Sequence, residues 1–503
     1  MEARNRQEWG FDPRQIHTVF LTHAHIDHSG RLPLLVKDGF RGKILTSPPT
    51  AELCGIMLLD AAHIQETEAE WENRKNKRRG RNELLPLYTT VDAEASLARI
   101  SPVQKDQFIE PEPGVKARLR EAGHILGSSV LELWLDGGKE SVKIVFSGDL
   151  GKKHQLILQD PEEIFDADYL FVESTYGNRM HRSFEESKEE LLEAIRYAVS
   201  HGEKVIIPSF AVGRTQDLLY VLSEFHREGR LPNIPVYIDS PLAIKATEIF
   251  RKNRSFYDDE AKAILDKGGD PFDLPGLHST PGVRESQAIN AVSGSAIIIA
   301  GNGMATAGRI RHHLKHNLWR PGSSLVVVGF QAAGSTGRKI VDGAKTVRIL
   351  GEEVSVRSKV FTIGGFSAHA DQGDLLEWVS HFESRPKVFV IHGEPSASEA
   401  LAQQIRERFQ LEVHVPRWKE KLILKGRAVT RETPAPHELQ PDFRKEMLSL
   451  VAELEGRLAG LKEAMGKETA GMPFGEEELD RLRWAREEIE AVVKDFQGRK
   501  EAS

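Results

Sequence analysis

The sequence contains a single cysteine, Cys54, in 503 residues. One thiol cannot build a disulfide framework or a zinc site of several thiolates, so both are excluded. The sequence also lacks any apolar run approaching the ~18 residues of a membrane-spanning helix, and its first residues are too polar for a secretory signal peptide. We therefore expect a cytoplasmic protein without membrane contact, in which histidines and carboxylates hold any metal ion.

The sequence also has no excess of positively charged residues. Lys and Arg number 68 against 75 Asp and Glu, which gives a formal net charge of −7, so nucleic acid binding would have to be local. Apolar residues make up 40 % and charged residues 28 % of the chain, which is the balance of a globular protein. The length allows roughly two to four domains of ~100–200 residues each.

Short apolar runs followed by polar loops characterise the first part of the chain. The runs at 19–21, 129–135, 142–146 and 169–172 predict buried strands, and 53–72 has helical spacing. From about 180 to 355, strand and helix signals alternate in the βαβ rhythm of a parallel sheet, which favours a second domain. The predicted helices there are 187–199 and 215–224, and the predicted strands are 205–207, 236–238, 296–300 and 325–328. Strand signals return at 360–363 and 388–391.

The tail has a different periodicity. Apolar residues from Met447 to Met465 are spaced alternately four and three apart, and a second amphipathic stretch follows a break at Gly471 and Pro473. This predicts a helical hairpin over 440–503. Packing against its own chain and dimerisation are both open roles, and a homodimer would use this hairpin or a face of the second domain.

The densest cluster of chemically useful side chains is His23, His25, Asp27 and His28, in the pattern His-x-His-x-Asp-His. Residues two apart in an extended segment point to one side, so the first two histidines can bind one ion. Asp27 and His28, after the chain turns, can face a second ion. Imidazole and carboxylate suit Zn²⁺ or Mn²⁺, and two ions ~3.5–4 Å apart can act together on a phosphate. Chance clustering in a polar turn is the alternative, and three histidines in six positions make it improbable.

Three further residues supply the ligands that the first motif lacks. His124 precedes a predicted strand, and Asp149 and His392 each follow one. Each alone would more often be a turn or capping residue. Together with the first motif, they complete a plausible set of seven ligands.

These elements, in this order, resemble the metallo-β-lactamase superfamily over nearly the whole chain except the tail. Later motifs resemble its β-CASP branch of nucleic acid nucleases: Glu173 in Glu-Ser-Thr-Tyr-Gly resembles motif A, His369 in Ser-Ala-His-Ala-Asp resembles motif B, and His392 in Ile-His-Gly-Glu resembles motif C. Glycine-rich arginine motifs between A and B resemble those of bacterial and archaeal ribonucleases similar to the endonuclease subunit of the cleavage and polyadenylation specificity factor.

The resemblance implies an α/β fold, namely an αββα metallo-β-lactamase sandwich with an inserted β-CASP α/β domain and a C-terminal helical hairpin. The implied boundaries are 1–178 for the first part of the metallo-β-lactamase domain, 179–355 for the β-CASP domain, 356–430 for the second part and 440–503 for the hairpin.

The resemblance also implies a catalytic site with two Zn²⁺ ions, with Mn²⁺ as the alternative. One ion would be bound by His23, His25 and His124, the other by Asp27, His28 and His392, with Asp149 bridging them. A bridging hydroxide would attack the scissile phosphate. His369 would lie near the leaving oxygen as phosphate binder or general acid, oriented by Glu173; the alternative for His369 is a packed histidine at a strand end.

The glycine-rich motifs predict contacts to RNA phosphates, because backbone N–H groups freed by glycine can hold anions together with arginine. The candidates are Ser209, Arg214, Arg309 and Arg338. For each arginine, an internal ion pair in an ordinary turn is an equal alternative. We expect Asn302, His312 and His313 to be structural.

The start of the chain departs from the family pattern. Several strands normally precede the histidine motif, whereas only 18 residues precede Val19 here. On this basis we expect either that the true start codon lies upstream or that the chain is a truncated product. A truncated product would have an unpaired sheet edge and would bind zinc weakly.

The predicted function is zinc-dependent hydrolysis of RNA. The alternatives are a hydrolase of small esters, thioesters or lactams, an RNA-binding subunit with little catalysis, and a DNA nuclease. The insertion disfavours the first, the complete ligand set disfavours the second, and the histidine in motif C disfavours the third. Endonucleolytic and 5′→3′ exonucleolytic cleavage are not distinguished by these residues.

Overall fold

The computed structural model describes residues 5–78, 82–138, 141–329, 331–332, 334–426, 428–432 and 451. One unit ends at Pro434, and the fold below is that of this unit. The predicted hairpin at 440–503 lies outside the described residues except for Val451. No helix among the described residues is long and apolar enough to cross a membrane.

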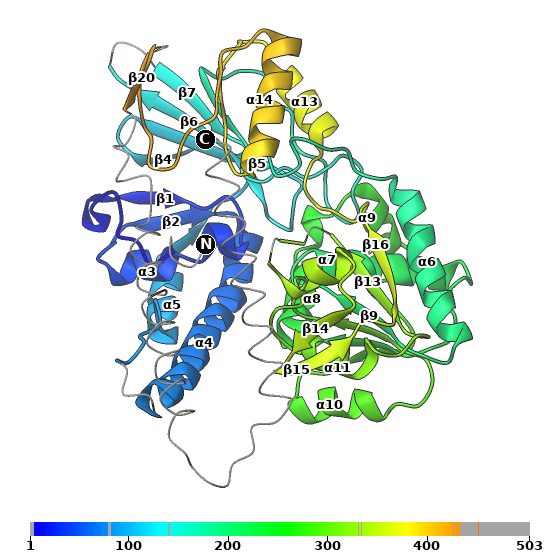
Figure 1. The fold of residues 1–503 in the computed structure, drawn as a ribbon. Helices are drawn as coiled ribbons and strands as arrows, with labels where there is room; N and C mark the ends of the chain where they lie inside the picture. The colour runs from blue at the N-terminus through cyan, green and yellow to red at the C-terminus, as the bar shows by residue number, and fades with distance from the viewer. Residues whose placement is uncertain are drawn as a thin grey trace, which may run out of the picture. The chain divides into compact units, whose positions relative to one another are not determined.

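Two sheets face each other in the part that carries the histidine motif (Figure 1). The smaller, parallel sheet has the order β1-β2-β3, with β1 at its edge, and the larger, mixed sheet has the order β18-β17-β8-β7-β6-β5-β4. Leu45 on the first sheet and Leu119 and Leu131 on the second share a buried cluster between them. The strands are β1 Thr18–Phe20, β2 Lys43–Thr46, β3 Ile100–Pro102, β4 Ile109–Glu112, β5 Val115–Glu121, β6 Ser129–Asp136, β7 Ser141–Phe146, β8 Tyr169–Val172, β17 Lys387–Val390 and β18 Val413–His414.

Helices cover the outer face of each of these sheets. The small sheet is covered by α3, α4 and α5, and the large sheet by α13 and α14, whose Leu375 and Leu401 pack on Leu170 and Val388. The layers are therefore αββα, as predicted. The helices are α2 Ile26–Ser29, α3 Leu32–Lys37, α4 Pro48–Arg78, α5 Thr90–Leu97, α13 Gln372–Ser380 and α14 Pro395–Phe409.

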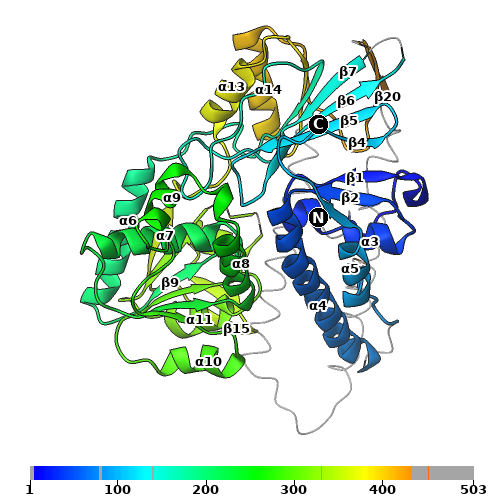
Figure 2. The ribbon, with the colours of Figure 1, turned by 180° about the vertical axis from the view of Figure 1, so that it is seen from behind.

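The inserted part contains a parallel sheet of order β11-β10-β12-β9-β13-β16, covered on both faces (Figure 2). Alternate residues of its strands face opposite ways: Ile207 belongs to the cluster with α6, α7 and α8, and Ile206 to the cluster with α11 and α12. This is the predicted α/β insertion. Its strands are β9 Val205–Pro208, β10 Val236–Asp239, β11 Leu277–Ser279, β12 Ile297–Ala300, β13 Ser324–Val328 and β16 Lys359–Ile363. Its helices are α6 Phe184–Ser200, α7 Arg214–Arg227, α8 Pro241–Lys252, α9 Asp259–Asp266, α10 Val283–Ala288, α11 Ile310–Asn317 and α12 Thr336–Val341.

The remaining described elements are short. They are the 3₁₀ helices η1 Pro13–Gln15, η2 Arg254–Phe256 and η3 Ile289–Ala291 and the antiparallel hairpins β14 Thr346–Ile349 with β15 Glu352–Ser355 and β19 Lys421–Lys425 with β20 Ala428–Glu432. The predicted strands and helices in the described residues are all present, some with shifted ends. Strand β16 pairs with β13, so the inserted sheet extends beyond residue 355.

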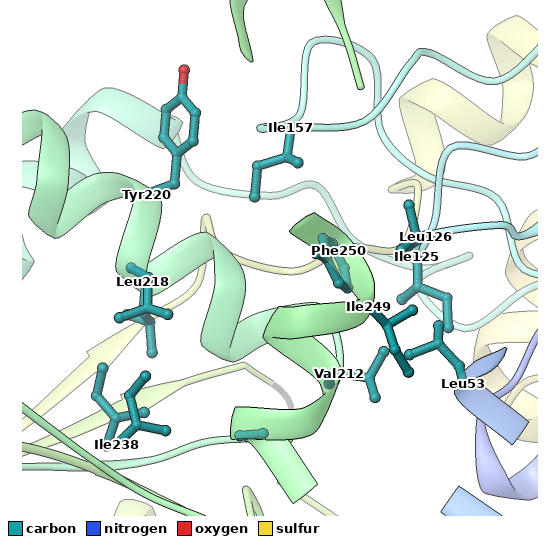
Figure 3. Close-up of a cluster of buried hydrophobic side chains, with 14 of the residues drawn as sticks. Leu53, Ile125, Leu126, Ile157, Val212, Leu218, Tyr220, Ile238, Ile249 and Phe250 are labelled. Atoms are coloured by element: carbon teal, nitrogen blue, oxygen red, sulfur yellow. The ribbon is translucent and has the colours of Figure 1, made fainter. Parts of the chain in front are cut away.

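One apolar cluster continues from the helical layer of α4 into the inserted part. Leu53 of α4 and Ile125 lie beside Val212 and Ile249 (Figure 3). Asn253 at the end of α8 also donates a hydrogen bond to Glu52 at 3.2 Å. This packing holds the start of α7 against the loop that contains His124.

Candidate metal centre

The first histidine motif lies in the loop that follows β1 and in the short helix α2. Leu21 continues the strand by hydrogen bonding to Leu45, and His25 then precedes the first turn of α2. The Thr22 hydroxyl lies 3.2 Å from Nδ1 of His23, which leaves Nε2 of this buried imidazole facing the centre. The loop therefore presents His23 and His25 on one side, as the alternation predicted, and α2 turns Asp27 and His28 toward a second position.

Four ligand atoms converge around the first position. Nδ1 of His25 lies 3.2 Å from Nε2 of His23 and 3.1 Å from Nε2 of His124. Oδ2 of Asp149 lies 3.4 Å from His23 and 3.7 Å from His124. In a tetrahedral site with zinc–nitrogen distances of ~2.0–2.1 Å, neighbouring ligand atoms are ~3.3–3.4 Å apart. These four side chains therefore fit the dimensions of a zinc site.

Three further groups surround a second position. Nε2 of His28 lies 3.1 Å from Nε2 of His392, and Oδ2 of Asp27 lies 3.8 Å and 3.5 Å from these two atoms. Oδ2 of Asp149 is also 3.3 Å from Nε2 of His28. One carboxylate oxygen thus faces imidazoles of both groups, and all seven predicted ligands come together in this pattern.

The protonation of the first group suits a cation. Burial, followed by the neighbouring His23, lowers the pKa of His25 to about 3. Burial also lowers the pKa of His23 and of His124. Uncharged imidazoles present lone pairs rather than protons. Oδ1 of Asp149 is buried without a hydrogen-bond partner, which is the condition expected of a polar site that is completed by a bound group.

Glu173 and His369 lie beside this cluster and touch each other. Oε1 of Glu173 accepts a hydrogen bond from the Leu150 N–H at 2.7 Å and lies 3.3 Å from Nδ1 of His369. Nδ1 of His369 is 3.9 Å from Oδ2 of Asp149. Burial opposes protonation of His369, but the carboxylates of Glu173 and Asp149 together outweigh it and raise the pKa of this imidazole. The pair can hold a proton next to the ligand cluster.

The predicted phosphate-binding residues are placed differently from one another. Ser209 is buried and its hydroxyl lies 3.0 Å from that of Thr215, and Arg214 is buried at the start of α7, 3.3 Å from Asp217. Arg309 donates inward to Asp239 at 2.7 Å and to the carbonyl of Thr280 at 2.6 Å. Arg338 pairs with Asp342 at 2.8 Å on the exposed side of α12. None of the four makes a hydrogen bond or ion pair with the histidine cluster within the described part of the chain, so their role in RNA binding remains a prediction.

Sequence reasoning missed the residues that support the ligands. Besides Thr22, these are Thr175, whose hydroxyl lies 3.2 Å from Nδ1 of His392, and His181, whose Nε2 lies 2.9 Å from the carbonyl oxygen of His369. Thr175 lies within the stretch that resembles motif A, two residues after Glu173, and this position was the only available signal. The two threonine hydroxyls lie next to ring nitrogens of ligands and can fix the orientation of those rings, whereas His181 holds the backbone of His369.

Replacing Thr175 with valine is expected to weaken metal binding at the position formed by Asp27, His28 and His392. The variant keeps the shape of the side chain and removes the oxygen next to Nδ1 of His392, and losses of such partners cost ~10–100-fold in affinity. Competition titration with a zinc-sensitive dye measures the effect. Thr346→Val, on an exposed strand residue, serves as the control, and equal affinities in the two variants would contradict the prediction.

The chain matches three family models in succession. Residues 1–209 match the metallo-beta-lactamase superfamily, residues 215–340 the Beta-Casp domain, and residues 353–416 the Zn-dependent metallo-hydrolase RNA specificity domain. These matches follow the order in which the sandwich, the insertion and the second part of the sandwich occur in the fold.

Similar proteins include Ribonuclease TTHA0252 of Thermus thermophilus, which is 37 % identical over 419 residues that cover 83 % of this chain and 90 % of the relative. Transcription termination factor FttA of Pyrococcus abyssi is 31 % identical over 79 % of this chain and 60 % of its own length. FttA of Lokiarchaeum is 30 % identical over 82 % of this chain and 64 % of its own length. The chain thus spans less than two thirds of these archaeal relatives. By its domain matches and its similarity along almost the whole of the Thermus protein, the chain belongs to the β-CASP branch of the metallo-β-lactamase superfamily.

Proposed function

We propose that this protein is a zinc-dependent ribonuclease that hydrolyses RNA phosphodiester bonds with two metal ions. The observation that carries the proposal is the position of Asp149, whose Oδ2 lies 3.3–3.7 Å from imidazole nitrogens of both ligand groups. A carboxylate shared between two sites is what a pair of adjacent ions needs. The match to an RNA specificity domain and a relative named as a ribonuclease support RNA as the substrate.

In this proposal His23, His25 and His124 hold one ion, Asp27, His28 and His392 hold the other, and Asp149 contacts both. Bound zinc would supply a water nucleophile near neutral pH and neutralise charge on the phosphate. Mn²⁺ is the alternative ion, because the nitrogen and oxygen ligands suit it as well.

The protein's own acid would be His369. Glu173 lies 3.3 Å from its Nδ1 and, together with Asp149, raises the pKa of the imidazole. In this proposal His369 delivers a proton to the leaving oxygen from its other nitrogen. Glu173 is in turn held by the N–H groups of Leu150 and Thr175. The carboxylate that orients His369 is thus itself held by the backbone.

Among the alternatives, hydrolysis of a small ester, thioester or lactam fits less well, because the matched β-CASP domain supplies a second wall that a small substrate does not require. A subunit that only binds RNA fits less well, because all seven ligands are present and converge. A homodimer through the inserted domain or the tail, and a cytoplasmic location, remain predictions.

The proposal can be tested by incubating zinc-loaded protein with RNA that is labelled at its 5′ end. We expect cleavage by the wild type and a loss of ~10²–10⁴-fold in rate for His369→Ala, the usual contribution of general acid–base catalysis, with unchanged zinc content. His226→Ala, on the exposed side of α7, is the matched control. Labelled fragments of intermediate length would indicate an endonuclease, and labelled mononucleotides a 5′→3′ exonuclease. Folded, zinc-loaded protein that spares RNA but opens lactams or thioesters would contradict the proposal.

A further inference from the structure

The segment after Asp149 runs alongside the segment that carries His369. Gly151 and His369 form an isolated antiparallel β-bridge, and the N–H of Ala370 donates to the carbonyl of Leu150 at 2.7 Å. The loop between β16 and α13, residues 364–371, is therefore aligned against residues 150–152. This loop is also where the chain passes from the inserted sheet back to the sandwich (Figure 1).

Lys152 is the side chain that joins these two segments at the start of the loop. Its ammonium donates a hydrogen bond to the carbonyl of Gly365 at 2.5 Å, four residues before His369, and lies 4.8 Å from the ring centre of Phe184. No carboxylate of a described residue lies within ion-pair distance of it. Burial and the nearby Arg214 lower the pKa of Lys152 to about 8, so this lysine occupies an unfavourable position for a charge. A hydrogen bond from a charged donor is about twice as strong as a neutral one.

The opposite side of the loop is held by α6 and by His181. The N–H of Gly365 donates to the hydroxyl of Ser187 at 3.1 Å, and a Cβ at position 365 would lie 2.3 Å from that oxygen. Phe366 is buried against Phe184. His181 lies next to the carbonyl of His369. The start of the loop is thus clamped between Lys152 and Ser187, and its placement sets where His369 lies.

We propose that Lys152 is a positioning residue, which by holding the carbonyl of Gly365 fixes His369 relative to Glu173 and Asp149. The catalytic part of this inference rests on the proposed ribonuclease function, since His369 is the acid in that reaction. The role differs from that of a lysine that binds RNA phosphate, because it acts on the geometry of His369 rather than on the affinity for substrate.

The test compares Lys152→Met, which removes the donor and keeps an unbranched chain, with Lys152→Arg, which retains a donor. Lys188→Met is the matched control, because the Lys188 ammonium lies near the same Phe184 ring but pairs with Glu224 at 2.9 Å. The first readout needs no activity: the rate at which diethyl pyrocarbonate modifies His369, measured by mass spectrometry of the His369 peptide. We expect faster modification in K152M and wild-type rates in K152R and K188M.

The second readout is RNA cleavage, measured for K152M in the otherwise wild-type protein and in the His369→Ala background. Because misplacement of a reacting group by about 1 Å can cost ~10²-fold, we expect K152M to lower kcat by ~10–100-fold with little change in KM or zinc content. In the His369→Ala background the same substitution should have no further effect, since residues that act through one another are not additive.

Three outcomes would overturn the inference: equal modification of His369 in K152M and the wild type, a rise in KM alone, or an undiminished loss of kcat in the His369→Ala background. If K152M does not fold, Lys152→Leu, which also lacks a donor, replaces it and the same readouts decide. Wild-type protein that spares RNA while the modification rates still differ would contradict the ribonuclease proposal and leave the positioning role standing.

Discussion

Replacing Asp149 with asparagine is expected to remove nearly all RNA cleavage, by at least ~10³-fold, because several kcal/mol of metal-based stabilisation would be lost. Oδ2 of Asp149 lies between His23 and His28, at 3.4 Å and 3.3 Å, and no other described side chain faces both ligand groups in this way. An amide keeps the size of the carboxylate but not its charge, so it cannot balance two divalent ions.

Metal analysis should show the same effect independently of activity. We expect fewer than two zinc ions per chain in Asp149→Asn after dialysis against trace zinc, as measured by inductively coupled plasma mass spectrometry. Asp266→Asn, on an exposed residue at the end of α9, is the control. A variant of Asp149 that retained two ions and the wild-type rate would show that this carboxylate does not bridge the proposed sites.

The largest effect on stability is expected at Asp239, at the end of β10 in the inserted sheet. Its side chain is completely buried and accepts hydrogen bonds from His313, Arg309, Ser286 and Thr280 at 2.6–2.8 Å. Asp239→Ala leaves the cationic Arg309 without its carboxylate, and breaking a buried pair in this way typically costs ~3–5 kcal/mol. Urea unfolding, with Asp266→Ala as the control, measures the loss. A loss below about 1 kcal/mol, the range of exposed pairs, would contradict this account.

The effect at Asp239 should also depend on pH. Burial opposes ionisation, but the hydrogen bonds, led by that from His313, hold the pKa of Asp239 well below its usual value. A lowered native pKa means that the carboxylate stabilises the fold at pH values above the unfolded pKa of ~3.9 and that this contribution is lost as the pH falls further. The difference in unfolding free energy between wild type and Asp239→Ala should therefore shrink below about pH 4. An unchanged difference at pH 3 would argue against the network.

The seven side chains of the cluster could be predicted together because one dense motif was joined by single residues at the ends of predicted strands. His23, His25 and His28 are adjacent in sequence, and Asp149 and His392 follow β7 and β17, which flank β8 in the same sheet. Parallel neighbours end at one edge, so residues that follow them meet there. The layers of the fold were predictable for the same reason, since buried strands and amphipathic helices have clear periodicities.

The supporting contacts were not predictable, because they depend on partners far away in the chain. Arg309 could equally have faced a phosphate or a carboxylate, and the choice is made by Asp239, which is 70 residues away. Lys152 follows Asp149 closely, yet its partner Gly365 is 213 residues away. Threonines and lysines are also common, so a residue such as Thr175 does not stand out until its neighbour His392 is located.

The contact between Glu173 and His369 joins residues separated by 196 positions, and the whole inserted sheet lies between them. In terms of chain entropy, the contact closes a loop, and the cost of closing a flexible loop grows only with the logarithm of its length, by ~0.6 kcal/mol for each doubling. The length of the insert is therefore only weakly constrained, whereas the contact between Glu173 and His369 fixes the distance between its two ends. A domain could be enlarged, shortened or exchanged at this point while Glu173 and His369 stay together.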